Sequence, residues 1–222
     1  MLRIKIQENE GVNDTKLQKI QTILSTEQAS KIQSLDISDL SLGRAKVNVL
    51  EDKQRLRNLE TLILADNNIT EDSQLNNLLH TQDNELPNLT TLVLVRNLFG
   101  DNGVQALSQM PIAKQLTNLM ISGPVYLGTE ITKVQHKEIT GSSFNILGQF
   151  LSLENLTMRY PNISGSDSIS QIESQVPHSL QTISLYGAYT REPNSTETQQ
   201  EDHKELEAKI IEAVKKRAVI SS

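Results

Sequence analysis

The segment LTTLVLVRNLFGDNGVQALSQM, residues 89–110, holds the pattern that decides the fold of this chain. It opens with the phrase Leu-x-x-Leu-x-Leu, and related phrases begin at residues 32, 59, 116, 153 and 180. The central apolar residues of the six copies are Leu35, Leu62, Leu92, Leu119, Leu156 and Ile183. Subtraction of their numbers gives spacings of 27, 30, 27, 37 and 27 residues. Six copies at a near-constant spacing indicate a repeat protein rather than a chance match.

Each copy predicts a short strand, because its apolar residues alternate with residues that face the other way. The segments between the strands have the apolar spacing of helices, as in the sets Leu17, Ile20 and Leu24; Val47 and Leu50; Leu75, Leu78 and Leu79; Val104 and Leu107; Phe144, Leu147 and Leu151; and Ile169, Ile172 and Val176. Strand–helix–strand units of this length require parallel strands. We therefore predict an α/β solenoid, a right-handed β-α superhelix with a curved parallel sheet on its concave side and helices on its convex side.

The two ends of the chain have the features of solenoid caps. The first residues, MLRIKI, alternate and predict an extra strand next to the first full repeat. Residues 191–202 are polar and predict a turn or linker, and the following EDHKELEAKIIEAVKKR predicts a charged helix with one apolar stripe, formed by Leu206, Ile210, Ala213 and Val214. We therefore divide the chain into a repeat domain, residues 1–190, and a polar linker with a capping helix, residues 191–222.

The segment 89–110 closely resembles a leucine-rich repeat of the ribonuclease-inhibitor type, and the resemblance extends over residues 1–190. It implies that the asparagine after the strand, Asn97 here and Asn67 one repeat earlier, bonds to backbone groups in the turn. It also implies that the stretch from Gly103 to Leu107 opens the convex helix. Other repeats depart from the pattern at the asparagine position, where they carry Leu40, Pro124, Pro161 and Ala188. Those turns must satisfy their backbone groups in another way.

The residues between and just after the leucines predict a binding surface on the concave side. They place an apolar patch on neighbouring strands, formed by Ile63, Ala65, Val93, Val95 and Met120. Polar residues border it, with Asp36, Asp39 and Asp66 toward the N-terminus and Arg96, Arg159, Tyr160 and Tyr186 toward the C-terminus. Apolar patches of this extent mark interaction sites, and tyrosine and arginine are enriched in binding hot spots. The alternative is that these are ordinary strand residues, or that a loop covers them.

The long spacing between the fourth and fifth repeats adds ten residues to the 27-residue unit, around residues 127–140. Insertions in solenoids form loops on one face, often the binding face. We expect a loop that either contacts the same partner or is a tolerated surface insertion.

The composition argues against several other functions. A net charge of −6 disfavours nucleic-acid binding, and the absence of cysteine excludes a thiol nucleophile or a Cys-type zinc site. The four histidines lie in separate units, so we expect no metal, no cofactor and no catalytic centre. The start MLRIKIQENEGVND has no apolar core, and no apolar run reaches the ~20 residues of a membrane span. We expect a cytoplasmic protein that is not bound to a membrane and is monomeric when unbound.

These observations favour a non-catalytic module that recognises one protein partner through its concave sheet and acts by steric occlusion. The short, irregular repeats also resemble the leucine-rich-repeat effectors of intracellular bacterial pathogens, of the Legionella kind. That resemblance implies secretion into the host cytosol without a cleavable signal peptide, and a host protein or another effector enzyme as the partner that is inhibited or modulated. The alternatives are a GTPase-activating protein of the leucine-rich Ran-activating type, with Arg96 or Arg159 acting electrostatically, or a scaffold subunit.

Overall fold

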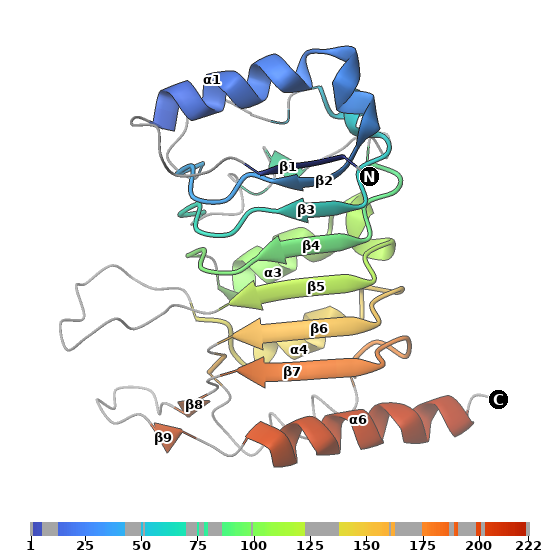
Figure 1. The fold of residues 1–222 in the computed structure, drawn as a ribbon. Coiled ribbons are helices and arrows are strands. Elements are labelled where there is room, and N and C mark those ends of the chain that lie inside the picture. The colour runs from blue at the N-terminus through green and yellow to red at the C-terminus, as the bar shows by residue number, and fades with distance from the viewer. Residues whose placement is uncertain are drawn as a thin grey trace.

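Seven parallel strands form the main sheet of the protein, in the order in which they occur along the chain (Figure 1). They are β1 (Leu2–Lys5), β2 (Ile32–Asp36), β3 (Thr61–Ile63), β4 (Thr91–Leu94), β5 (Asn118–Ser122), β6 (Asn155–Arg159) and β7 (Thr182–Tyr186). The computed structural model describes residues 2–5, 13–42, 50, 52–69, 75, 78–79, 86–98, 100–122, 138–159, 161–162, 175–186, 189–190, 199–200 and 203–220. The predicted α/β solenoid with a curved parallel sheet is confirmed.

The central residues of the six repeats lie side by side in the sheet. Leu35 is in register with Leu62, and the same register continues through Leu92, Leu119 and Leu156 to Ile183. All six are buried in one hydrophobic cluster. Each repeat thus buries its apolar face against its neighbours, which is how a solenoid forms a continuous core.

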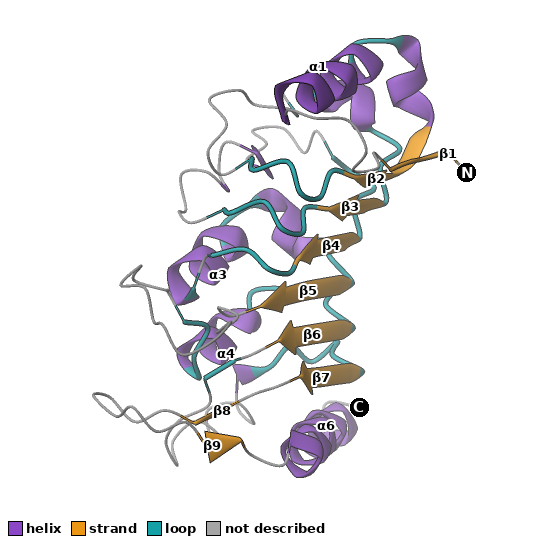
Figure 2. Ribbon diagram, turned by 60° about the vertical axis from the view of Figure 1, so that its left-hand side comes forward, coloured by secondary structure: helices purple, strands orange, loops and turns teal. Residues whose placement is uncertain are grey.

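Helices cover one face of the sheet and leave the other face open (Figures 1 and 2). The described helical elements are α1 (Asn13–Leu24), η1 (Glu27–Lys31), η2 (Lys53–Leu56), α3 (Asp101–Ser108), η3 (Pro111–Lys114), α4 (Ser142–Leu147) and α6 (His203–Ile220). As predicted, α3 buries Val104 and Leu107, and α4 buries Phe144 and Leu147. The prediction for Leu151 is wrong, because α4 ends at Leu147 and Leu151 is 65% exposed in the turn beyond it. The helices predicted around Val47 and around Ile169 and Ile172 lie outside the described residues.

Both ends of the sheet carry the predicted caps. β1 pairs in parallel with β2, which confirms the extra N-terminal strand. α6 packs against β7, where Ile210 is buried and the carboxylate of Glu207 accepts a hydrogen bond from the backbone N–H of Leu185. Before α6, the predicted linker includes β9 (Gln199–Gln200), which pairs antiparallel with β8 (Tyr189–Thr190). The division of the chain at residue 190 stays a prediction.

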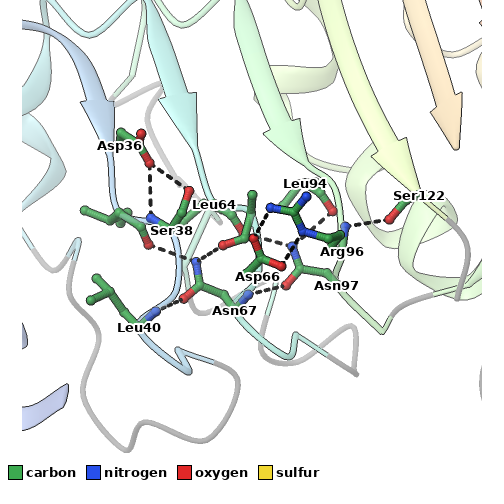
Figure 3. A network of polar contacts seen from close by, with 12 residues as sticks. Asp36, Ser38, Leu40, Leu64, Asp66, Asn67, Leu94, Arg96, Asn97 and Ser122 are labelled. Carbon is green, nitrogen blue, oxygen red and sulfur yellow. Dashed lines mark hydrogen bonds and ion pairs between the residues drawn. The ribbon is translucent and has the colours of Figure 1, made fainter. Parts of the chain in front are cut away.

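Two buried asparagines hold the turns after the strands (Figure 3). The Asn97 side chain accepts hydrogen bonds from the N–H groups of Asn67 and Ile69, both at 3.1 Å, and donates to the carbonyls of Leu64 and Leu94. Asn67 accepts from the N–H groups of Leu40 and Leu42 and donates to the carbonyls of Ile37 and Ala65. The expected bonding of both asparagines is confirmed, and each one also serves the turn of the preceding repeat.

That arrangement explains how turns without the asparagine are satisfied. The first turn has Leu40 at this position, and the side-chain oxygen of Asn67 in the next repeat accepts a hydrogen bond from the Leu40 N–H. Next to Pro161, the Asn162 N–H donates to the carbonyl of Ile139 and the Asn162 side chain to the carboxylate of Glu138. The turns at Pro124 and Ala188 lie outside the described residues.

Candidate protein-binding face

α3 and α4 lie on one face of the sheet and leave the other uncovered (Figure 1). The strand register defines three rows of side chains on the uncovered face. Leucines such as Leu62 and Leu92 point into the core. The residues that alternate with the leucines along each strand therefore point to the uncovered face. The strand register aligns an outer row of Ser34, Thr61, Thr91, Asn118, Asn155 and Thr182, a middle row of Asp36, Ile63, Val93, Met120, Thr157 and Ser184, and a third row that includes Ser122, Arg159 and Tyr186. We call this surface the open face.

The middle of the open face is apolar. Ile63 is in register with Val93, and Val93 with Met120, on the neighbouring strands β3, β4 and β5. All three side chains are partly exposed, in line with the predicted alternation. They form a short apolar strip that crosses three strands, and they are the part of the predicted patch that a partner can reach.

Three residues predicted for this surface are buried instead. Ala65 and Val95 are only 6% and 8% exposed, and Asp36 is 7% exposed. Backbone pairing continues past the strand ends, since the Asp39 N–H donates to the Ala65 carbonyl and the Asp66 N–H to the Val95 carbonyl. Neighbouring chain therefore flanks these short side chains on both sides, and the prediction that they face open water is wrong.

The burial of Asp36 has a local cause. Its carboxylate accepts hydrogen bonds from the backbone N–H and the hydroxyl of Ser38, at 3.2 and 2.7 Å (Figure 3). It also lies between Lys5 and Ile63 in the sheet register. The carboxylate is thus engaged within its own turn and is not an open acidic border of the patch.

The turns after β2, β3 and β4 adopt the left-handed backbone conformation at Asp39, Asp66 and Arg96, with φ of 58°, 57° and 56°. Asp66 and Arg96, predicted at opposite borders of the patch, form an ion pair with each other, in which the guanidinium donates to both carboxylate oxygens (Figure 3). The Arg96 N–H also donates to the Ser122 hydroxyl at 2.6 Å. Exposed ion pairs of this kind contribute little to stability. Because the Arg96 guanidinium already binds Asp66, it is less available to act on a bound GTPase, which weakens the GTPase-activating alternative.

Arg159 and Tyr186 stand together at the C-terminal end of the open face. They are in register on β6 and β7, and the guanidinium carbon lies 5.7 Å from the centroid of the tyrosine ring, within the range of a cation–π contact. Tyr186 is 58% exposed. Tyr160, predicted to belong to the same group, lies outside the described residues.

The outer row was not predicted as part of the site. Its amides and hydroxyls bond from strand to strand: the Asn118 amide donates to the Thr91 hydroxyl at 3.2 Å, the Asn155 amide to the Asn118 carbonyl oxygen at 2.8 Å, and the Thr182 hydroxyl to the Asn155 carbonyl oxygen at 2.6 Å. The signal in the sequence is a Thr or Asn before the central leucine of five successive repeats. This ladder forms a polar border along one side of the apolar strip.

The end of the predicted insertion is anchored beside α3. The carboxylate of Asp101 accepts from the Thr140 N–H at 2.8 Å and from the hydroxyls of Thr140 and Ser143. Thr140 also forms a parallel bridge with Asn162. The rest of the insertion, residues 127–137, lies outside the described residues, so its contact with a partner stays a prediction.

The described residues offer no group of three or more His, Cys, Asp or Glu side chains that could hold a metal ion. Within the same part of the chain, no helix is both long and apolar enough to cross a bilayer. The side chains of the open face suit contact with another polypeptide, since they combine an apolar strip, a polar border and an Arg–Tyr pair.

The chain was compared with protein families, with curated sequences and with solved structures, and the family comparison agrees with this fold. A family model described as "Leucine Rich repeat" matches residues 55–72 and 85–108. An internalin (inlF) from Listeria monocytogenes has a similar structure, with 18% identity and a TM-score of 0.35; the match covers 80% of this chain and 57% of that one. Internalin C2 of the same species matches at 16% identity and a TM-score of 0.31, covering 76% of this chain and 91% of that one. No curated protein sequence matches the chain significantly.

The repeat match and the sheet geometry identify the architecture. The family model covers the repeats built around Leu62 and Leu92, which are in register in the sheet and carry the two turn asparagines. The more specific resemblances, to ribonuclease-inhibitor repeats and to effectors of the Legionella kind, stay predictions. The chain is a leucine-rich-repeat solenoid, an architecture of protein-interaction modules.

Proposed function

We propose that this solenoid is a non-catalytic recognition module that binds one protein partner through the open face of its sheet. The observation that carries the proposal is the strip of Ile63, Val93 and Met120, partly exposed and side by side on three hydrogen-bonded strands. Burial of each side chain by a partner contributes on the order of 1.5–3 kcal/mol at full burial. Because the strip is part of a rigid sheet, binding costs little ordering of the module itself.

The proposed mode of action is steric. A partner held on the open face has the contacted part of its own surface covered, which inhibits it when that part includes its functional site. The resemblance of the short, irregular repeats to bacterial effectors supports a more specific version, in which the module acts in a host cytosol on a host protein or on another effector enzyme.

The test compares two glutamate substitutions that add the same charge at different places. Val93→Glu places a carboxylate in the middle of the apolar strip, and we expect it to abolish partner binding. Leu151→Glu is the matched control, because Leu151 is exposed in the turn after α4 and does not belong to the open face. Thermal unfolding followed by circular dichroism checks that both variants fold like the wild type.

The measurement is retention of partners from host-cell lysate and from a bacterial proteome, read by mass spectrometry and then by surface plasmon resonance with the purified partner. A protein that binds the wild type and Leu151→Glu but not Val93→Glu supports the proposal. Equal binding by all three chains would place the interaction elsewhere and overturn it. A GTP hydrolysis assay with any GTPase among the retained proteins separates simple occlusion from activation.

A further inference from the structure

Among the residues that the structure describes, Arg159 has no carboxylate partner on the open face. Its guanidinium lies over the ring of Tyr186, and within the described part of the chain its Nε is buried and has no hydrogen-bond partner. A buried donor without an acceptor is costly, and a guanidinium in this state gains more from an incoming acceptor than one that is already paired.

Three other charged side chains near the strip already have partners within the protein. Asp36 is occupied by Ser38, and Asp66 and Arg96 neutralise each other. Among the described residues, Arg159 therefore provides an unneutralised positive charge at the C-terminal end of the open face, in a chain whose net charge is −6. Guanidinium groups bind carboxylates through directed, charge-assisted hydrogen bonds, and an adjoining exposed tyrosine provides contact area for the same ligand.

We propose that Arg159 and Tyr186 bind an acidic side chain of the protein partner while an apolar side chain of the same partner packs on Met120. This inference rests on the proposed function and names the chemistry that the partner must present. Met120 is in register with Thr157, and Arg159 follows two residues later on that strand. Strand spacing and rise then place Met120 and Arg159 ~8 Å apart, which is about two or three residues of an extended peptide.

The test selects ligands for the purified chain from a phage-displayed library of random linear peptides. The wild type is expected to enrich peptides that have an Asp or Glu two or three positions from an apolar residue. The Kd of the best peptide, and of the same peptide with its acid replaced by Asn or Gln, is then measured by fluorescence anisotropy. Loss of a charge-assisted hydrogen bond predicts about tenfold or greater weakening for the amide version.

Three variants assign the effect to the arginine. Arg159→Gln is expected to bind both peptides equally weakly, and Arg159→Lys to recover only part of the preference, because an ammonium lacks the planar donor fork. Arg57→Gln is the matched control, since it removes the same charge from an exposed turn before β3. It should bind like the wild type.

The outcomes separate this inference from the proposed function. If the wild type enriches apolar peptides with no acidic preference, or if Arg159→Gln keeps that preference, the acid site is wrong and the binding face stands. If the wild type selects no peptide, or if Val93→Glu binds the selected peptides as well as the wild type, both proposals are overturned.

Discussion

The two buried asparagines show how single residues hold a solenoid of unequal repeats together. An amide side chain donates and accepts at once, so Asn97 bonds to two N–H groups and two carbonyls of adjacent turns. Asn67 makes the same kind of contacts one repeat earlier. Because each asparagine reaches back to the preceding turn, the pair connects three successive repeats.

Replacing Asn97 should therefore be costly. Asn97→Ala leaves four buried backbone groups without their partner, and an unsatisfied buried group costs about 1–3 kcal/mol. We expect a loss of at least about 3 kcal/mol in the free energy of unfolding, measured by urea denaturation. Asn88→Ala, which removes one exposed bond to the carbonyl of Arg57, is the control and should cost less than about 1 kcal/mol. Equal effects of the two would contradict the role assigned to Asn97.

Val93 and Val95 make a second pair of contrasting residues. The alternation along the strand places both on the same side, yet Val93 is partly exposed and Val95 is buried. Val95→Glu puts a carboxylate at a position that is only 8% exposed, so we expect it to lower the melting temperature strongly or to prevent folding. Val93→Glu should melt close to the wild type. Similar melting of both variants, followed by circular dichroism, would show that the burial of Val95 is incidental.

Among the elements, α6 has the clearest structural task. A sheet edge exposes unpaired N–H and C=O groups, which invite association with other chains. α6 covers the edge of β7: Glu207 accepts from the Leu185 N–H, and Ile210 enters the core. The helix thus both seals the hydrophobic cluster and satisfies a donor of the last strand.

The contact between α6 and β7 can be tested at Glu207. Glu207→Ala removes the acceptor for the Leu185 N–H, and we expect a loss of about 1–3 kcal/mol with faster hydrogen exchange of that amide. Glu207→Gln keeps a carbonyl oxygen and should retain most of the protection. If the alanine variant exchanged at the wild-type rate, the hydrogen bond would not be what protects the edge.

The molecule is a row of units, and in the part of the chain that the structure describes each strand of the main sheet pairs with its neighbours in sequence order. In such a protein each unit is stabilised by contacts with its neighbouring units. The units at the two ends must therefore present an outer surface that does not associate with other chains. The free chain is therefore expected to be monomeric while both of its caps are in place.

Removal of residues 203–220 tests this expectation. The truncated chain lacks Ile210 and exposes the edge of β7 and the core around Leu185, so we expect it to unfold at lower urea concentration and to self-associate. Light scattering after size-exclusion chromatography measures the mass, with the intact chain at the same concentration as the control. If the truncated chain stayed monomeric and equally stable, the proposed capping role of α6 would be wrong.

The repeat architecture can be derived from the local sequence pattern alone. The alternation around residues such as Leu62 and Leu92 is a local pattern, and its recurrence at spacings of 27–37 residues leaves parallel stacking as the way to bury it. The same local reasoning located β1 and α6, whereas the turn roles of Asn67 and Asn97 came from the resemblance to a leucine-rich repeat. Apolar spacing predicts the ends of helices less well. It placed Leu151 in the core, whereas α4 ends before this residue and leaves it exposed.

Only the tertiary structure decided which side chains of the open face are available. The burial of Ala65 and Val95 depends on how neighbouring turns continue the backbone ladder. The pairing of Arg96 with Asp66 joins residues 30 positions apart. Among the described residues, the lack of a carboxylate partner for Arg159 likewise depends on where the other charged side chains lie. The exposure and the hydrogen-bond partners of a side chain depend on the residues that surround it. A sequence pattern predicts to which face of the sheet a side chain points, but not which other side chains and turns lie next to it.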